Sequence, residues 1–430
     1  QAEDGIRDSV ASRGLGDVYK RQFLRWIPLI IVILIVEWYA FQAIKTAFNN
    51  KWLLGVYSLI VVLVLGNFFW QFFGYDRAEG WTHAISYAIG FFVALASLQI
   101  VLFSFLFLED IIRLLRACFE FFSEKRSFDI PYRRKFISQI AIGLGAIPFA
   151  SLLYGMYQGR YNYKVLNYTL EYDDLPEEFN GFKITQISDL HCGSLDNFEK
   201  VAYGVDLINQ QKGDVILFTG DLVNSVAKEA APWVKLFSKI TAPFGKFSVL
   251  GNHDYGDYTE WKSISAKEKN LQDLFNFHQE MGFDLLLNES RKIEKNGNKI
   301  AIIGVENWGA GRFKKAGDLS KSLTEVDEND FKILLTHDPS HWDAEVLPHK
   351  FPFHLTLSGH THGFQFGIEI PGWFKWSPIK WRYKQWAGIY ESENQKLNVN
   401  RGFGYLAYPG RVGIWPEITV ITLKKRNSLV

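Results

Sequence analysis

The chain has 430 residues, enough for two or three domains, and its charges balance at 47 Lys and Arg against 46 Asp and Glu. A net charge of +1 gives no overall polyanion-binding character, so we expect no nucleic-acid partner. The two cysteines, Cys118 and Cys192, lie in regions of different composition. We therefore expect no disulfide between them, and cysteine does not indicate the redox compartment.

Residues 1–22 differ from everything that follows them. They lack an initiator Met and an apolar periodicity, and glycines recur among charged residues. The stretch resembles a translated sequencing-adapter tail of the kind found on metagenomic fragments, and the alternative is a short disordered extension. In either case we expect residues 1–22 to be a non-native or disordered tail outside the fold.

Residues 23–157 contain four windows long enough to span a bilayer, whose core of ~30 Å needs ~20 apolar residues. The last three windows contain no Asp, Glu, Lys or Arg, whereas the first contains Glu37. A carboxylate in hydrocarbon costs free energy, so we expect Glu37 to face another helix or an interface, and a helix–helix contact is favoured over a functional role. The sequence thus predicts an all-α transmembrane bundle, with windows near 23–45, 52–73, 84–108 and 136–157.

The loop between the third and fourth windows, residues 109–135, is basic. By the positive-inside rule it lies in the cytoplasm, which puts the N-terminus and residues 158–430 outside. The stretch from Tyr132 to Ile137 resembles a twin-arginine export signal, and the alternative is that its two arginines merely flank a helix. Both interpretations predict a multi-pass protein of the bacterial cytoplasmic (inner) membrane with an extracytoplasmic C-terminal domain. The basic residues of the loop are Arg113, Arg116, Lys125, Arg126, Arg133, Arg134 and Lys135.

Residues 158–430 have the composition of a soluble domain. Short apolar runs predict buried strands, and amphipathic stretches predict helices. Strands that first alternate with helices and then follow one another closely favour an α/β fold, a sandwich of sheets covered by helices. The expected strands are 164–172, 182–188, 215–218, 247–250, 300–305, 331–335, 355–357 and 418–423, and the expected helices are 198–211, 227–240 and 267–281.

Five of the expected strands end on side chains that can bind metal. Open α/β sheets build their sites at the carboxyl ends of strands. A single Asp or His there is most often a surface or capping residue, but five such ends together predict a two-metal hydrolase site. Nitrogen and oxygen ligands without thiolate suit Mn, Fe or Zn, and Cys192 is expected to pack rather than to bind metal. The candidates are Asp189 with His191, Asp221, Asn252 with His253 and Asp254, His337, and His360 with His362.

In this order, the motifs DLH, GD, GNHD, a single His and GHTH resemble those of the calcineurin-like metallophosphoesterase family. The resemblance covers roughly residues 160–426. It implies a calcineurin-like four-layer α-β-β-α sandwich that holds two divalent metal ions. The first ion would take Asp189, His191, Asp221 and His362, and the second would take Asp221, Asn252, His337 and His360.

The resemblance also implies the reaction. A hydroxide that bridges the two ions would attack phosphorus and cleave a phosphoester, phosphodiester or pyrophosphate bond. His253 would stabilise the transition state or protonate the leaving oxygen, and Asp254 would orient its ring. We expect the carboxylate of Asp254 to keep the pKa of His253 high enough for the ring to donate a proton.

Two further stretches bear on substrate choice. Residues 364–386 interleave aromatic and basic side chains, which is typical of a membrane interface, and the alternative is a hydrophobic loop packed on the domain. Arg401 or Arg411 could hold a substrate phosphate bidentately or form a structural ion pair. The chain near these arginines resembles a bacterial membrane-associated branch of the family, some members of which cleave the pyrophosphate of UDP-2,3-diacylglucosamine, a lipid A precursor. An outward site fits a phosphorylated or phosphodiester lipid better than this cytoplasmic precursor.

The sequence therefore predicts a membrane-anchored dinuclear-metal phosphohydrolase, with a phosphoester substrate that can be lipid-linked and with membrane lipids as partners. The alternative is a non-catalytic metal-binding sensor or scaffold module coupled to the transmembrane helices. The presence of both His253 and Asp254 argues against that alternative, because a purely structural site needs neither. A transporter-like role is disfavoured by the shortage of intramembrane charge apart from Glu37. The sequence does not indicate the oligomeric state.

Overall fold

The computed structural model describes residues 27–78, 80–123, 133–370 and 372–426. The chain divides into two compact units, residues 1–69 with 91–151 and residues 70–90 with 152–430. The predicted tail over residues 1–22 lies outside the described residues, as do Lys125 and Arg126 of the predicted basic loop.

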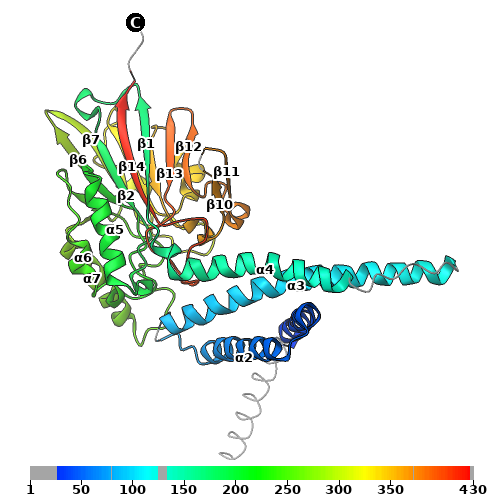
Figure 1. Ribbon diagram of the computed structural model, residues 1–430. Coiled ribbons are helices and arrows are strands. Elements are labelled where there is room, and N and C mark those ends of the chain that lie inside the picture. The colour runs from blue at the N-terminus through cyan, green and yellow to red at the C-terminus, as the bar shows by residue number, and fades with distance from the viewer. Residues whose placement is uncertain (1–26, 79, 124–132, 371, 427–430) are drawn as a thin grey trace, which may run out of the picture. The chain divides into compact units, whose positions relative to one another are not determined.

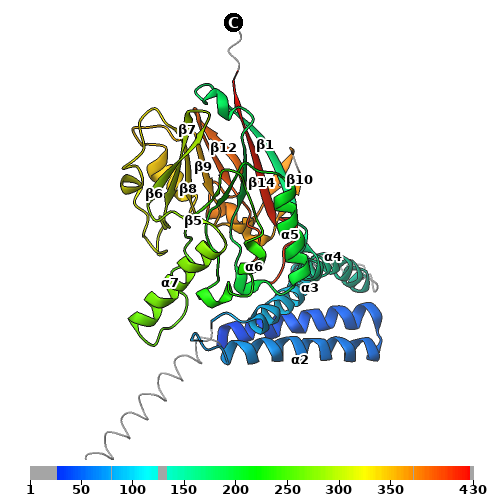
Figure 2. The ribbon, with the colours of Figure 1, turned by 90° about the vertical axis from the view of Figure 1, so that its left-hand side faces the viewer.

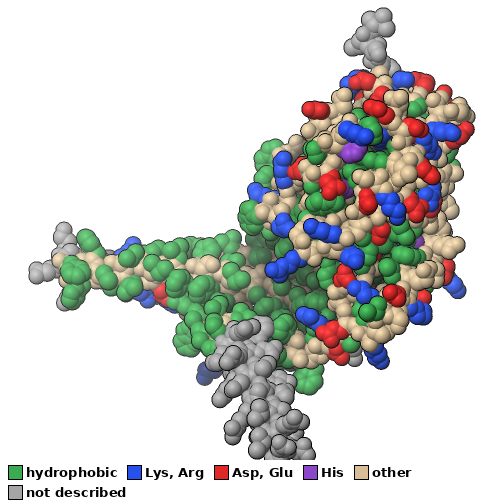
Figure 3. All heavy atoms as spheres, turned by 180° about the vertical axis from the view of Figure 1, so that it is seen from behind, with side chains coloured by type: hydrophobic (Ala, Val, Ile, Leu, Met, Phe, Trp, Pro, Cys, Tyr) green, Lys and Arg blue, Asp and Glu red, His purple; other side chains and the backbone are tan. Residues whose placement is uncertain are grey.

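The first unit is built from long apolar helices. Within the described residues, four helices have the length and composition needed to cross a membrane. Their side chains are largely hydrophobic and exposed, as the green helices of Figure 3 show, and Trp52 is exposed to 85%. Such a surface is stable in lipid hydrocarbon but not in water. The helices are Ile27–Phe48, α2 (Lys51–Phe73), α3 (His83–Ser123) and α4 (Arg133–Tyr157) (Figure 1).

The third helix is longer than its apolar window predicts. It has 41 residues, about 60 Å at 1.5 Å per residue, twice the thickness of a bilayer core. Its polar continuation is held by ion pairs: Arg113 binds Glu109 one turn away at 2.7 Å, and Arg134 of α4 binds Glu109 at 3.1 Å. The first part of the predicted basic loop is therefore helical. The contact of Arg134 suits an arginine that flanks a helix.

Glu37 makes the predicted helix–helix contact. Its carboxylate accepts hydrogen bonds from Gln99 Nε2 at 2.5 Å and from the Tyr57 hydroxyl at 3.1 Å. Gln99 lies on α3 and Tyr57 on α2, so three helices meet at this carboxylate. A polar group inside the membrane is tolerated when neighbouring helices satisfy it in this way.

The second unit contains two six-stranded sheets and a hairpin (Figures 1 and 2). Figure 2 shows β6 to β9 on one side and β1 with β14 on the other. The first sheet has the order β1 (Lys164–Tyr172), β14 (Glu417–Lys425), β2 (Lys183–Ile187), β3 (Val215–Phe218), β4 (Lys246–Ser248), β5 (Asp284–Leu285). The second has the order β12 (Gly388–Ser392), β13 (Gln395–Val399), β9 (Leu355–Ser358), β8 (Phe331–Thr336), β7 (Asn298–Val305), β6 (Glu289–Lys295). The hairpin pairs β10 (Ile368–Ile370) with β11 (Phe374–Trp376).

The two sheets pack face to face because their strands are apolar on both sides. Successive side chains of a strand point to opposite faces. Leu217 of β3 and Ile302 of β7 therefore lie in the core between the sheets, whereas Phe218 faces the helices outside the first sheet. Ile303 faces outward from the second sheet and packs with Trp342. The result is the predicted α-β-β-α sandwich.

Three helices cover the outer face of the first sheet: α5 (Phe198–Gln210), α6 (Val234–Phe237) and α7 (Ile264–Glu280). On α5, Val201, Val205 and Ile208 form one buried stripe, and the side chain of Asn197 caps the helix by accepting from Lys200 N–H at 3.0 Å. The second sheet is covered by α8 (Leu319–Ser322) and by the π-helical turn Trp342–Val346.

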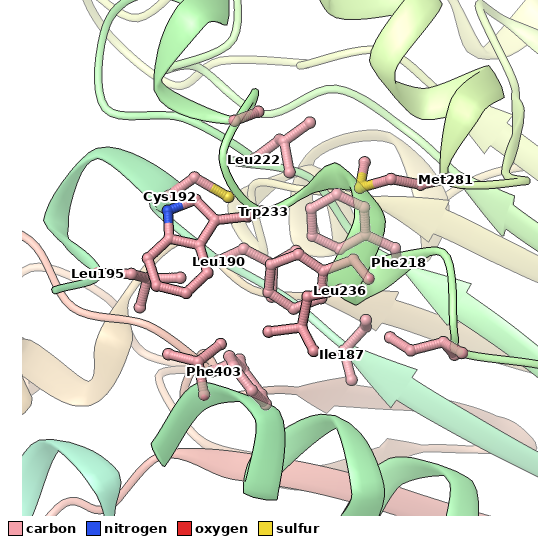
Figure 4. Packing of buried hydrophobic residues seen from close by; sticks show 14 of the residues in the cluster. Ile187, Leu190, Cys192, Leu195, Phe218, Leu222, Trp233, Leu236, Met281 and Phe403 are labelled. Atoms are coloured by element: carbon pink, nitrogen blue, oxygen red, sulfur yellow. The ribbon is translucent and has the colours of Figure 1, made fainter. Parts of the chain in front are cut away.

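Cys192 belongs to the hydrophobic cluster under these helices (Figure 4). Its side chain lies among Leu195 and Trp233, and burial raises the pKa of its thiol well above the ordinary value. A neutral, buried thiol packs as a small apolar group, as the sequence predicts.

The predicted elements of this unit differ from the structure mainly where charges interrupt apolar runs. The helix predicted over 227–240 is instead the short turn Ala227–Glu229 followed by α6. The sequence also misses β6, with the sequence ESRKIEK, and the pair β12 and β13. β6 and β12 are the two edge strands of the second sheet, and β13 lies between β12 and β9. Strands at or beside an edge tolerate charged and polar side chains, which apolar periodicity does not detect.

We expect His278 of α7 to make stability depend on pH. It is fully buried, and burial lowers its pKa to about 3. In the unfolded chain its pKa is near 6.5, so between pH 3 and 6.5 the imidazole is neutral in the folded protein and protonated in the unfolded one. The contribution of His278 to the free energy of unfolding should therefore be fully present above pH ~6.5. It should decline as the pH falls toward 3, by up to ~1.4 kcal/mol per pH unit.

The unfolding midpoint of the full-length protein in detergent and EDTA, measured from pH 4 to 8 for the wild type and His278→Phe, tests this. The wild type should lose more stability than the variant as the pH falls. Parallel profiles would contradict the prediction.

Candidate metal centre

The predicted ligands come together where strands of both sheets end. Asp189 and His191 follow β2, Asp221 follows β3, and Asn252 follows β4 of the first sheet. His337 follows β8, and His360 and His362 follow β9 of the second sheet. Neighbouring parallel strands end at a common edge, so residues far apart in sequence meet there.

One group of side chains consists of Asp189, His191 and His362. All three are buried, and their ligand atoms lie within 4.8 Å of one another. The Nε2 atoms of His191 and His362 are 2.9 Å apart, and Asp189 Oδ1 is 3.2 Å from His362 Nε2. Nitrogen and oxygen atoms that converge at such distances can surround one divalent ion.

A second group consists of Asp221, His337 and His360, whose ligand atoms also lie within 4.8 Å of one another. Asp221 connects the two groups: its Oδ2 atom is 3.1 Å from His337 Nε2 and 3.6 Å from His191 Nε2. A carboxylate between two ligand sets is the arrangement that two neighbouring ions require.

Two buried polar atoms test whether the site fits a metal. Asn252 Oδ1 and His337 Nε2 make no hydrogen bond to any described residue, although the amide nitrogen of Asn252 donates to the Tyr258 hydroxyl at 2.8 Å. Buried polar atoms are normally hydrogen-bonded, so each such exception needs an explanation. A divalent ion would satisfy both atoms, and the donor set fits one.

The loops that carry the candidate ligands have an unusual backbone. Asp189, His191, Asp221, His360 and His362 all adopt positive φ, between 47° and 72°. This left-handed conformation costs non-glycine residues about 1 kcal/mol or more each, and it concentrates at functional sites. The surrounding fold holds these side chains against their local preference.

Gly251 allows the Asp221 carboxylate to come close to the loop after β4. A Cβ atom at this position would lie 2.7 Å from Asp221 Cγ and from its backbone nitrogen. The next N–H groups use this proximity, since His253 N–H donates to Asp221 Oδ1 at 2.9 Å. The glycine of the GNHD motif is therefore required by space.

Hydrogen bonds to carbonyl groups fix the imidazole tautomers. His337 Nδ1 lies 2.7 Å from the carbonyl oxygen of Thr219, and His253 Nδ1 lies 2.6 Å from that of Asn224. A carbonyl oxygen only accepts, so Nδ1 carries the proton in both rings. The Asn224 side-chain oxygen is 3.1 Å from His191 Nδ1 and has the same effect. In each ring Nε2 remains for the metal centre or for proton transfer.

Asp221 and His337 stabilise each other's charged form. Burial disfavours ionisation of Asp221, but His337 beside it outweighs burial and holds the pKa of Asp221 well below its ordinary value. In return Asp221 raises the pKa of His337 to about 10 against the effect of burial. Burial lowers the pKa of His360 to about 4. A buried carboxylate that keeps its charge is a strong ligand for a cation.

Asp254 does not orient His253, contrary to the expectation from the sequence. Its carboxylate accepts the backbone N–H groups of Gly251 at 2.8 Å and of Asp221 and Leu222 at 2.9 Å. It therefore joins the loops after β3 and β4, and the Asn224 carbonyl orients His253. The expected high pKa is also wrong, because burial lowers the pKa of His253 against the attraction of Asp221.

Comparison with known proteins agrees with this geometry. Residues 182–364 match the calcineurin-like phosphoesterase family, and residues 24–160 match a family described as the probable transmembrane domain of a calcineurin-like phosphoesterase. The uncharacterized metallophosphoesterase YkuE of Bacillus subtilis is 32% identical over 301 residues, 69% of this chain and 98% of YkuE. The chain belongs to the calcineurin-like metallophosphoesterases.

This metallophosphoesterase is also similar to a eukaryotic transmembrane protein and to a further bacterial protein. The transmembrane protein with metallophosphoesterase domain of Danio rerio is 27% identical over 375 residues, 85% of this chain and 79% of that protein. An uncharacterized metallophosphoesterase of Aquifex aeolicus is 28% identical over 288 residues, 65% of this chain and 100% of the relative. The predicted family is thus confirmed: the protein is a metal-dependent phosphoric ester hydrolase associated with a membrane.

The two arginines proposed to bind phosphate are engaged within the metallophosphoesterase fold. Arg401 is buried and forms ion pairs of 2.5 Å with Glu369 and with Glu417. Arg411 is fully buried and donates to the carbonyl oxygens of Gly404 at 2.6 Å and Arg401 at 2.7 Å. For Arg401 this is the structural ion pair that the sequence left open, and these contacts do not support phosphate binding by either arginine.

In the aromatic and basic segment over residues 364–386, some rings pack on the domain and others are exposed, so each interpretation of the sequence fits part of it. Trp386 is buried against Ile414, whereas Trp373 is 81% exposed and Trp381 is 76% exposed. Bilayer contact by the exposed rings stays a prediction. Tyr383 has a role that the sequence did not indicate, since its hydroxyl lies 2.7 Å from His360 Nε2 and leaves Nδ1 of that ring for a metal.

We expect Asn224, another residue that sequence reasoning missed, to be needed for metal binding. Replacing it by Ala removes the oxygen that holds His191, and loss of such a supporting contact costs ~10- to 100-fold in metal affinity. Mn²⁺ binding to the full-length protein measured by calorimetry tests this. Asn276→Ala, at an exposed position of α7, is the matched control and should bind as the wild type does. Equal affinities for the two variants would contradict the prediction.

Proposed function

We propose that the protein is a membrane-anchored dinuclear-metal phosphohydrolase that cleaves a phosphoester or phosphodiester bond. The observation that carries this proposal is the position of Asp221 Oδ2 between His191 and His337, each from a different ligand group. Two divalent ions of Mn, Fe or Zn, when bound, supply Lewis-acid activation of the phosphate and of water. Asp189, His191, His362 and Asp221 would hold one ion, and Asp221, Asn252, His337 and His360 the other.

His253 is the proposed catalytic side chain that binds no metal. Its ring centroid lies 5.0 Å from that of His191, so it borders the first ligand group. With Nδ1 donating to the Asn224 carbonyl, Nε2 is the atom that can stabilise a phosphoryl oxygen or exchange a proton with the leaving oxygen. Asp254 is a positioning residue, because it acts through the backbone of the loop that carries His253.

The alternative is a metal-binding sensor or scaffold without catalysis. A structural site normally closes all ligand positions with protein atoms. Here the imidazole of His253 stands beside the ligands without being one of them, and it also lines a pocket. That arrangement suits a site that admits a substrate.

The proposed substrate is a phosphoester that can be lipid-linked, because the catalytic unit is joined to four candidate spans. We also propose that the catalytic unit lies outside the cytoplasmic membrane of a bacterium. An even number of spans places the loop between α2 and α3 on the same side as residues 158–430. The hydrogen bond from Thr259 Oγ1 to the carbonyl oxygen of Arg77, 2.6 Å long, agrees with a common side.

We expect metal-dependent phosphodiesterase activity that depends on Asp221 and His253. Asp221→Asn should lower the turnover of bis(p-nitrophenyl) phosphate with Mn²⁺ by more than ~100-fold, because even residues that merely support ligands cost up to that factor. His253→Gln should lower it by ~10²- to 10⁴-fold, the usual contribution of acid–base groups. Asp206→Asn, at an exposed position of α5, is the matched control for charge. Stoichiometric metal binding without turnover of this substrate, of p-nitrophenyl phosphate or of a lipid phosphate in micelles would favour the sensor.

We expect reporter fusions to place the C-terminus and residues 74–82 outside and the segment between α3 and α4 in the cytoplasm. Alkaline phosphatase, which is active outside, and green fluorescent protein, which is fluorescent inside, give opposite readouts at each site. A cytoplasmic C-terminus would overturn the proposed orientation and would again favour a nucleotide-linked lipid precursor as substrate.

A further inference from the structure

The pocket of about 420 Å³ that His253 lines has a composition that bears on the kind of substrate it admits. Its volume lies at the lower end of the range for small-molecule sites, ~300–1,000 Å³, which suits one short acyl or aryl group. Residues from four separate stretches of the chain form it. Those that matter here are His253, Tyr258, Leu406, Ala407, Tyr75 and Trp81.

His253 connects the pocket to the ligands. Its ring centroid is 4.4 Å from that of Tyr258 in the pocket and 5.0 Å from that of His191 in the first ligand group. A phosphorus atom held at the ligands would therefore have one ester oxygen on the side of His253. The organic group on that oxygen would extend into the pocket.

The loop between α2 and α3 supplies part of the wall. Tyr75 follows the last residue of α2, Phe73, by two positions, and Trp81 precedes the first residue of α3, His83, by two. Trp81 is held in place, because its Nε1 donates to Ser86 Oγ at 2.8 Å and its ring meets that of Tyr75 edge-on at 6.0 Å. Tyr75 and Trp81 thus have defined positions within this unit.

The position of the loop in the chain sets its depth. A residue within two positions of a membrane-spanning helix lies at the level of the lipid headgroups, where Trp and Tyr are enriched. Both Tyr75 and Trp81 meet this condition. The pocket wall therefore lies where the phosphate of an amphiphile lies.

The walls select apolar bulk rather than additional charge. Most of the exposed surface inside the pocket is apolar, and the charged residues of its lining offset one another. Asp257 is ion-paired with Lys267, which leaves Arg77 against Glu260. A second phosphate or a cation on the ligand gains no net attraction there.

We propose that this pocket binds the apolar ester group of an amphiphilic phosphoester. Tyr75 and Trp81, in the loop between α2 and α3, determine the preference for an apolar group. The proposal rests on the proposed function, because it places the phosphate of the same substrate at the metal centre. It makes the loop between two membrane helices part of the substrate site.

Alkylphosphonates test the pocket without turnover, because each carries one phosphate-like group and one alkyl chain. Calorimetry on the full-length protein in detergent with Mn²⁺ would compare hexylphosphonate with methylphosphonate. We expect the wild type to bind the hexyl compound at least ~10-fold more tightly, since each buried methylene contributes about fourfold at most. Trp81→Ala, which opens the wall, and Ala407→Phe, which fills the pocket, should each reduce this ratio to within ~3-fold.

Trp373→Ala is the matched control, because it removes an exposed Trp outside the pocket and should keep the wild-type ratio. The ratio of two ligands on one preparation is insensitive to partial loss of folded protein. A wild-type ratio near one, or a ratio unchanged in both pocket variants, would overturn the proposal even if Mn²⁺-dependent hydrolysis is present. A ratio that depends on Trp81 and Ala407 without hydrolysis would support the pocket and refute the hydrolase.

Discussion

The carboxylate of Asp221 is the group on which the site depends. One oxygen lies between His191 and His337, and the other accepts the backbone N–H of His253. The group keeps its charge in a fully buried position only because imidazoles and backbone donors surround it. Gly251 gives it the necessary space. The positive φ angles of the ligand residues are a consequence, because the backbone must turn sharply to aim five side chains at one point.

The loops around Asp221 are connected by polar groups that bind no metal themselves. Asp254 joins the loops after β3 and β4 through backbone N–H groups, and Asn224 contacts both His191 and His253. Tyr258 and Tyr383 fix Asn252 and His360 from two further segments. His191, Asn252 and His360 are thus each oriented by a second residue, as precise metal sites require. Asn224 and Tyr258 also line the pocket together with His253, so the residues that support the ligands extend to the proposed substrate pocket.

The loop between α2 and α3, with Tyr75 and Trp81, links the membrane helices to the proposed substrate site. In the proposed topology the loop between α2 and α3 lies on the same side of the membrane as the catalytic unit, and the contact of Thr259 with Arg77 agrees with this. Tyr75 and Trp81 line the pocket beside His253, so in our proposal the segment that joins two membrane helices takes part in substrate binding.

The sequence by itself determined the four spans, the α/β sandwich and the family, because apolar periodicity and short ligand motifs are local properties of the chain. The ends of β2, β3, β4, β8 and β9 could be recognised from residues such as Asp221 and His337 for the same reason. Only the tertiary structure decided the role of Asp254, the ion pairs of Arg401 and the contribution of Asn224, Tyr258 and Tyr383. Those depend on which donor and acceptor meet across loops that are distant in sequence, as when Tyr383 reaches His360. The charged edge strand β6 and the pocket beside His253 belong to the same class, because pairing and cavities are properties of the packed chain.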